Sequence, residues 1–174
     1  MINNKPKILE RNQILPIISL LNSGQNQDAL NAVENLITDF PDKALLLNLR
    51  GACYENLGLL DKSADSFKKA LAIQPNYLEA QYNLGVIQGK LCQIDSSIKS
   101  YKKLIEIKPT HIDARNNLGN ALIQNLKFDE AIIHLKYAIS VNPKFAEAHN
   151  NLGLAYLEIN QVNKAIKNFE QAIK

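Results

Sequence analysis

Hydrophobic positions along this chain recur three and four residues apart, which is the spacing of a helix with one apolar face. Over Ile112–Asn125 the expected inward side chains are Ala114, Leu118, Ala121, Leu122 and Asn125. A second run, Asp129–Val141, places Ile132, Leu135, Ala138 and Ile139 in the same way. Pro143 follows two residues later and cannot continue a helix. The pattern therefore predicts two consecutive helices closed by a proline.

The same arrangement returns every 34 residues. Four columns keep this interval: Pro41, Pro75, Pro109 and Pro143; Gly51, Gly85, Gly119 and Gly153; Val33, Phe67, Tyr101, Leu135 and Phe169; Ala29, Ser63, Ser97, Ala131 and Ala165. A constant period of this length is typical of stacked helical or mixed units. The glycine column lies inside helices, where Gly costs about 1 kcal/mol relative to Ala. We expect close approach of the partner helix, at the small Ala and Ser column, to offset that cost.

These residues resemble the tetratricopeptide repeat. The resemblance rests on the 34-residue period, the closing prolines and three Leu-Gly pairs, Leu84-Gly85, Leu118-Gly119 and Leu152-Gly153. The usual Trp of the first helix is replaced here by Leu47, Gln81, Arg115 and His149. The resemblance implies an all-α fold, a right-handed superhelical solenoid of antiparallel helix-turn-helix hairpins. It divides the chain into a flexible tail (1–9), a degenerate first repeat (10–43), three complete repeats (44–77, 78–111 and 112–145) and a last one (146–174).

The two ends depart from the regular unit. Pro16 stands where a helix would otherwise run, so we expect a shortened first helix from about Leu15, followed by a normal helix over Gln27–Asp39. The last unit stops three residues before its expected proline, and no polar capping helix follows. A solenoid end without such a cap leaves core residues in water. We therefore expect Ala165, Phe169, Ala172 and Ile173 to be partly bare, and either a longer polypeptide or another chain to cover them.

In this repeat family the first helices line a concave groove, so their outward residues are the candidate contacts. They are Glu79, Asp113 and Glu147; Tyr82, Asn116 and Asn150; Asn83, Asn117 and Asn151; and Asn120. An Asn amide offers donors and an acceptor and can hold a peptide group through both its N–H and its C=O. The Asn83, Asn117 and Asn151 column resembles the groove of the protein O-linked N-acetylglucosamine transferases, which hold substrate polypeptides. The chain also has 21 asparagines, so abundance alone is an alternative explanation.

Composition and charge narrow the function further. The 20 basic and 17 acidic residues leave a net charge of +3, too little to argue for nucleic acid or a membrane surface. Cys53 is expected in the core and Cys92 in a turn. His111, His134 and His149 fall on different units or faces, without a paired carboxylate or metal-ligand spacing. The sequence thus predicts a cytoplasmic protein with no enzyme activity, no metal and no cofactor.

Three functional hypotheses follow. The first is a scaffold that binds an extended peptide or partner protein in the concave groove. The second is the substrate-recruiting N-terminal region of a larger transferase, with a glycosyltransferase as one example by resemblance. The third is an assembly scaffold that associates with its own copy through the uncapped last helix.

Overall fold

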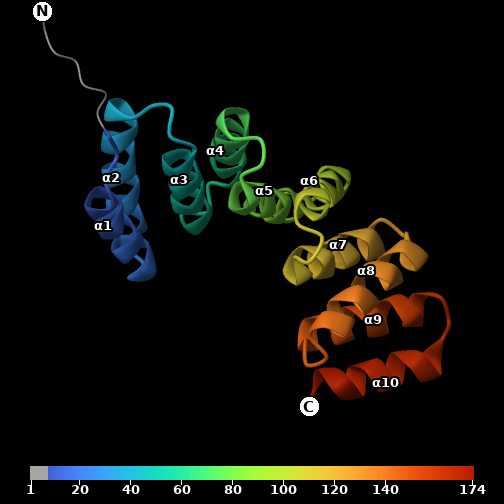
Figure 1. Cartoon of the computed structure of the whole chain (residues 1–174). Coiled ribbons are helices and arrows are strands. Elements are labelled where there is room, and N and C mark those ends of the chain that lie inside the picture. The colour runs from blue at the N-terminus through green and yellow to red at the C-terminus, as the bar shows by residue number, and fades with distance from the viewer. Residues whose placement is uncertain (1–7) are drawn as a thin grey trace, which may run out of the picture. The chain divides into compact units, whose positions relative to one another are not determined.

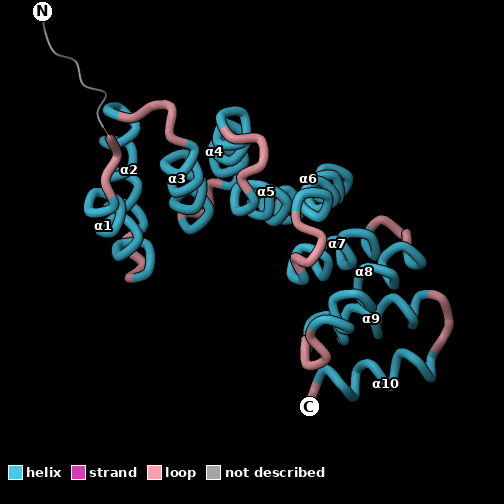
Figure 2. Tube along the Cα trace, viewed as in Figure 1, coloured by secondary structure: helices cyan, strands magenta, loops and turns pink. Residues whose placement is uncertain are grey.

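The computed structural model describes residues 8–174, and ten helices account for most of them (Figures 1 and 2). Their bounds are α1 Arg11–Asn22, α2 Asn26–Asp39, α3 Ala44–Asn56, α4 Leu60–Ile73, α5 Leu78–Lys90, α6 Ile94–Ile107, α7 Ile112–Gln124, α8 Phe128–Val141, α9 Ala146–Glu158 and α10 Val162–Ala172. The described residues contain no strand, which confirms the all-α hairpin prediction. The N-terminal residues of the predicted tail, 1–7, lie outside the described part. No helix in the described part is long and apolar enough to cross a membrane.

The chain forms two compact units, one ending at Ile87 and the other starting at Gln88. In each unit the helices pack as consecutive hairpins: α3 against α4 in the first, and α7 against α8 and α9 against α10 in the second. The first helix of a hairpin also packs on the hairpin before it, as α3 does on α2 and α9 does on α8. Cys53, fully buried, belongs with Leu46 and Leu49 to the core that α3 forms with α1 and α2, as the sequence predicts.

The first helix is longer than the sequence predicts. It begins at Arg11, and Pro16 lies inside it. A capping box of Glu10 and Gln13 holds its start: the Glu10 backbone N–H donates to Gln13 Oε1 at 3.0 Å. The proline removes one hydrogen bond, but Pro16 and Asn12 are both exposed, so water can satisfy the freed carbonyl. The predicted start at Leu15 is therefore wrong, and the predicted second helix is correct to within one residue.

Each hairpin turns through a residue in the left-handed backbone region. The five positions are spaced by 34 residues, and their φ angles are 75° at Gly24, 74° at Gly58, 56° at Cys92, 58° at Leu126 and 57° at Asn160. A side chain makes this conformation costly for most residues, whereas Gly adopts it freely and Asn tolerates it. Cys92 is exposed at this turn. The turn geometry therefore persists where the sequence has lost its glycine.

Replacing Leu126 by Gly should stabilise the chain. The left-handed conformation costs Leu about 1–2 kcal/mol, and Leu126 is 75% exposed, so little burial is lost. Glycine's larger freedom in the unfolded chain returns about 0.5–1 kcal/mol of this. We expect the free energy of unfolding to rise by up to about 1 kcal/mol in urea titrations.

Asn160→Gly is the matched control and should change the free energy of unfolding less, because Asn tolerates the left-handed conformation. A loss of stability in Leu126→Gly would contradict the idea that the backbone of Leu126 is strained.

The glycines inside the first helices make room for large side chains of the second helices. A Cβ at Gly51 would lie 2.5 Å from Phe67 Cε1, one at Gly119 2.5 Å from Leu135 Cγ, and one at Gly153 2.5 Å from Phe169 Cε1. The second helix does approach these glycines closely, as expected. The side chains that lie against them, however, are the large apolar ones, Phe67, Leu135 and Phe169. The small column lies beside them, where Ser63 Oγ donates to the Gly51 carbonyl at 2.8 Å.

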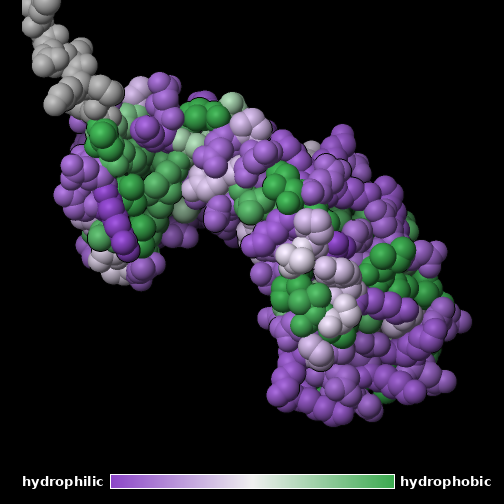
Figure 3. Space-filling model, viewed as in Figure 1, coloured by the Kyte–Doolittle hydropathy of each residue, from purple (hydrophilic) through white to green (hydrophobic). Residues whose placement is uncertain are grey.

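The last hairpin is only partly uncovered. Ala165 is 1% exposed, which contradicts the expectation that it would be bare, because it packs in the interface between α10 and α9. Phe169 and Ala172 are half-buried, and Ile173 is 87% exposed. At the other end of the chain, the α1–α2 hairpin also shows hydrophobic surface (Figure 3), including Leu15 at 49% and Ile18 at 39%.

Candidate functional site

The predicted asparagine column connects first helices to one another. Asn83 on α5 donates from Nδ2 to Asn48 Oδ1 on α3 at 3.3 Å. Asn151 on α9 makes the same bond to Asn116 Oδ1 on α7 at 2.9 Å. The two bonds span 35 residues each, so they repeat one geometry in both units. These amides therefore hold neighbouring hairpins in register, a role that the sequence pattern does not reveal.

Asn116 is buried, at 7% exposed, although it was expected on the surface of the groove. Its Nδ2 donates to Asn117 Oδ1 at 3.4 Å, and Asn117 Nδ2 donates to the Tyr101 hydroxyl at 3.4 Å. Together with the bond from Asn151, this makes a continuous chain of hydrogen bonds from the amides of α9 and α7 to the Tyr101 hydroxyl of α6. A buried amide is costly unless it is hydrogen-bonded. The hydrogen bonds of the Asn116 side chain are therefore made within the protein, and the bond from Asn151 joins α7 to α9.

An open groove of about 530 Å³ lies along α7 and α9 in the second unit. It contains six of the ten predicted residues, and its full lining is Asn116, Asn117, Asn120, Ala146, Glu147, Asn150, Asn151, Ala172 and Ile173. Asp113 is exposed on α7 outside this lining. Glu79 is exposed on α5, and Tyr82 and Asn83 on the same helix are half-buried, all in the first unit. The structure thus brings together the predicted residues of α7 and α9.

Amides and one carboxylate dominate the polar lining of this groove. Glu147 is its single charged residue, and no Lys or Arg lines it. Asn120 and Asn150 are exposed. Within the described part of the chain, neither side chain has a hydrogen-bond partner. Their amide groups can therefore donate to and accept from a ligand without breaking a bond between helices.

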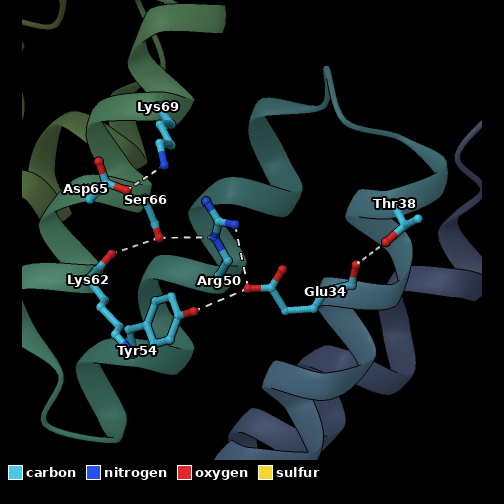
Figure 4. Close-up of polar contacts among 8 residues, drawn as sticks. All are labelled: Glu34, Thr38, Arg50, Tyr54, Lys62, Asp65, Ser66 and Lys69. Atoms are coloured by element: carbon cyan, nitrogen blue, oxygen red, sulfur yellow. Dashed lines mark hydrogen bonds and ion pairs between the residues drawn. The ribbon is translucent and has the colours of Figure 1, made fainter.

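A polar cluster that the sequence did not indicate joins α2, α3 and α4 (Figure 4). Arg50 on α3 is central: its Nε donates to Ser66 Oγ at 3.2 Å, and its guanidinium lies 3.6 Å from Glu34 Oε1. The Tyr54 hydroxyl donates to the same Glu34 oxygen at 3.3 Å. Burial and the Glu34 charge raise the pKa of Tyr54. The cluster links two consecutive hairpins, so its evident role is structural.

The neighbouring Cys53 thiol is buried. Burial raises its pKa to about 11, so the nucleophilic thiolate is scarce at neutral pH.

A second polar cluster surrounds Arg115, which occupies one of the former Trp positions. Arg115 Nε donates to the Pro109 carbonyl at 2.8 Å, and its guanidinium carbon lies 3.8 Å from the centre of the Tyr137 ring. Its Nη1 lies 3.2 Å from His134 Nδ1. Burial, followed by the Arg115 charge, lowers the pKa of His134. A salt bridge from Lys102 at 2.6 Å likewise lowers the pKa of Glu130.

The histidines serve local structure. His111 Nδ1 accepts from the Ala114 backbone N–H at 3.3 Å and caps α7. His149 lies 2.9 Å from the Pro143 carbonyl and 3.2 Å from Asn168 Oδ1. Among residues 8–174, no group of three His, Cys, Asp or Glu side chains could hold a metal ion.

Solved structures with the same fold cover nearly the whole chain. A crystal structure of MamA superposes with a TM-score of 0.84 at 23% identity, over 96% of this chain and 95% of that one. MamA from Desulfovibrio magneticus RS-1 gives 0.87 at 20% identity, over 94% and 92%. YrrB, described as a TPR protein with an unusual peptide-binding site, gives 0.80 at 22% identity, over 94% and 84%. At this level of identity the likeness establishes the fold.

A curated relative matches over a shorter segment. The peroxisomal targeting signal receptor of Candida albicans is 41% identical over 46 residues, which is 26% of this chain and 8% of the receptor. The chain therefore corresponds to a small part of that protein.

Family models cover most of the sequence. Models described as tetratricopeptide or TPR repeats match residues 17–77, 78–111, 100–133 and 127–160. They follow one another through nine of the ten helices, and they agree with the 34-residue period and with the helical hairpins seen in the structure. The chain belongs to the tetratricopeptide repeat family.

Proposed function

We propose that this chain is a protein-interaction module that holds an extended peptide in the groove of α7 and α9. The observation that carries the proposal is the convergence of unengaged amides, Asn120 and Asn150, on one open groove. YrrB offers a precedent for peptide binding by a protein of this fold. The finer resemblance to O-linked N-acetylglucosamine transferases rests on the three in-register asparagines alone.

The hydrogen bonds within the protein determine which asparagine side chains are available to bind the peptide. Asn151 Nδ2 and Asn116 Oδ1 bond to each other at 2.9 Å, and breaking that bond to bind a ligand would offset the gain. Asn120 and Asn150 carry no such cost. Each supplies a donor and an acceptor, which is the complement of a peptide group. We therefore assign peptide backbone recognition to Asn120 and Asn150, and stacking of the hairpins to Asn116 and Asn151.

The number of contacts makes the module a weak binder. A net hydrogen bond contributes about 0.5–1.5 kcal/mol, so a few amide contacts correspond to affinities near the millimolar range. The single carboxylate, Glu147, and the absence of cations in the lining favour peptides with a Lys or Arg over acidic peptides.

Selection from a random 12-residue peptide library displayed on phage tests this proposal. Peptides enriched on the full chain should bind the double variant Asn120→Ala/Asn150→Ala at least about 5-fold more weakly by NMR titration, because two or more hydrogen bonds are lost. Methylating the peptide's backbone nitrogens should weaken binding similarly. Asn163→Ala, which removes an exposed amide on α10 outside the groove, is the control. Equal affinity of the double variant and the parent chain would refute the proposal that the peptide binds in this groove.

A further inference from the structure

Charged side chains of consecutive second helices meet at a fixed place in the second unit. Lys102 on α6 and Glu130 on α8 form a salt bridge there at 2.6 Å. Their equivalents one period later are Lys136 on α8 and Lys164 on α10, which are both positively charged. Lys136 Nζ lies 5.8 Å and Lys164 Nζ 5.3 Å from the centre of the Tyr156 ring. Neither ammonium group forms a salt bridge with any described residue. The last hairpin thus has two positive charges where the preceding one pairs opposite charges.

The first unit holds a carboxylate at the same place. Tyr54 is the equivalent of Tyr156 three 34-residue periods earlier, and Glu34 is the equivalent of Lys136. The Tyr54 hydroxyl donates to Glu34 Oε1 at 3.3 Å, and Lys62 Nζ lies 5.7 Å from the centre of the Tyr54 ring (Figure 4). The tyrosine and one lysine are therefore common to both units, whereas the acceptor is present only in the first.

The Tyr156 hydroxyl has no hydrogen-bond partner among residues 8–174, although Tyr156 is only 6% exposed. In this part of the chain, Gln81 Oε1 is the one fully buried side-chain oxygen or nitrogen without a partner. The Tyr156 hydroxyl is therefore in contact with solvent and can donate to a ligand. Together with the two ammonium groups, it forms a set of donors that lacks an acceptor.

This place is open because of its position in the repeat and not because of its nearness to the last residue. The Lys102 and Glu130 side chains remain 43% and 36% exposed, although α7 packs on α6 and α9 packs on α8. Lys136 is likewise exposed with α9 packed on its helix. Lys136, Lys164 and Tyr156 do not line the groove of α7 and α9. The site is therefore separate from the one assigned to the peptide.

We propose that Lys136, Lys164 and the Tyr156 hydroxyl bind a side-chain carboxylate, from an Asp or a Glu, of a partner protein. The two ammonium groups donate charge-assisted hydrogen bonds to its oxygens, and the hydroxyl donates a further one. A carboxylate is the expected ligand because the protein itself places one here twice, against the Tyr54 hydroxyl and against Lys102. The preference is opposite to that of the groove, whose single charged residue is Glu147.

An NMR titration of the ¹³C,¹⁵N-labelled full chain tests the proposal. The probe is a tripeptide with blocked ends and a central Glu between two glycines, and the matched neutral probe has Gln in place of the Glu. We expect the Glu probe, at millimolar concentrations, to shift the ring signals of Tyr156 and the ε-CH₂ signals of Lys136 and Lys164. The Gln probe should leave these signals in place. Added salt should weaken the binding, because the two ammonium groups are exposed.

Three variants separate this site from general attraction between charges. Lys136→Glu puts a carboxylate of the chain itself at the site and should weaken binding of the Glu probe at least about tenfold. Lys99→Glu makes the same change of charge at an exposed position of α6 and should alter the affinity less than about twofold. Tyr156→Phe keeps the ring, loses one hydrogen bond and should weaken binding about 2- to 10-fold.

Several results would overturn the proposal. They are equal shifts with the Glu and Gln probes, an unchanged affinity in Lys136→Glu, and tighter binding of inorganic phosphate than of the Glu probe, which would make phosphate the ligand. Lys164→Gln replaces Lys136→Glu in the comparison if circular dichroism shows that the latter disturbs the fold. Since no residue of this site lines the peptide groove, the result is independent of the proposed function.

Discussion

Gly51→Ala will lower the free energy of unfolding by up to about 2 kcal/mol, although alanine is the better helix former. The added Cβ would lie 2.5 Å from Phe67 Cε1 and 2.7 Å from Cδ1. Phe67 is 0% exposed, so its ring has no solvent-filled space into which it can move. Overpacking a core costs about 1–3 kcal/mol or more, which exceeds the gain of about 1 kcal/mol from helix propensity. Urea denaturation followed by circular dichroism measures the difference.

Gly89→Ala is the matched control for this prediction. Gly89 also lies inside a helix, α5, but a Cβ there would meet only Ser97 Oγ, at an ordinary 3.7 Å. The same substitution should therefore raise stability by up to about 1 kcal/mol. The two glycines are expected to respond with opposite signs. Stabilisation in both variants would show that the Phe67 ring yields to the methyl group and that the glycine column is not needed for packing.

Arg115→Met will lower the free energy of unfolding by about 1–3 kcal/mol while keeping an apolar stem of similar length. The variant loses the bond to the Pro109 carbonyl at 2.8 Å and the stacking on Tyr137 at 3.8 Å. It also removes a positive charge beside His134, so the pKa of His134 should rise toward its ordinary value of 6.5. Part of the depression will remain, because burial is its larger cause.

The pH dependence of stability follows from His134. Its pKa in the folded chain lies below its unfolded value of 6.5, so the unfolded chain takes up the proton first as the pH falls. The contribution of His134 to stability is therefore complete above pH 6.5 and is lost as the pH falls from there to the depressed pKa. Arg115→Met should lose less stability over this interval than the parent chain. Denaturation at two pH values and an NMR titration of His134 test this. Arg50→Met, in the other unit, is the control and should leave the pKa of His134 unchanged. An unaltered pKa of His134 in Arg115→Met would refute the effect of the Arg115 charge on that pKa.

The repeat period was sufficient for predicting the helices because each hairpin buries the same apolar columns. It placed α8 and α7 to within one residue at each end. The prediction for α1 was wrong because Pro16 does not interrupt the helix, although it removes one of its hydrogen bonds. The capping box of Glu10 and Gln13 holds the start of the helix, and the exposure of Asn12 and Pro16 leaves the freed carbonyl accessible to solvent. The solvent exposure of Pro16 cannot be deduced from the repeat pattern, because that pattern marks only the buried positions.

The candidate site was predictable in its residue types and only partly in their roles. The asparagines do gather on one groove, since residues 34 apart occupy equivalent places on successive first helices. Their hydrogen bonds were not predictable, because an amide can bind a ligand or a neighbouring helix equally well. The bond of 2.9 Å between Asn151 and Asn116 distinguishes these alternatives. The Glu34–Arg50–Tyr54 cluster was missed for a similar reason, as its members come from two hairpins and share no repeat column.

The sequence by itself determined the fold of this protein, because apolar residues at helical spacing within each 34-residue unit form a face that stacking on the neighbouring unit buries. It also determined which residue types reach the surface of the first helices. Only the tertiary structure decided what each of them does there. Burial and hydrogen bonding depend on which neighbour is present, and that neighbour differs between the inner hairpins and the last one. For this reason Asn116 is buried and bonded to the neighbouring helix, whereas Asn150, its equivalent 34 residues later, is exposed.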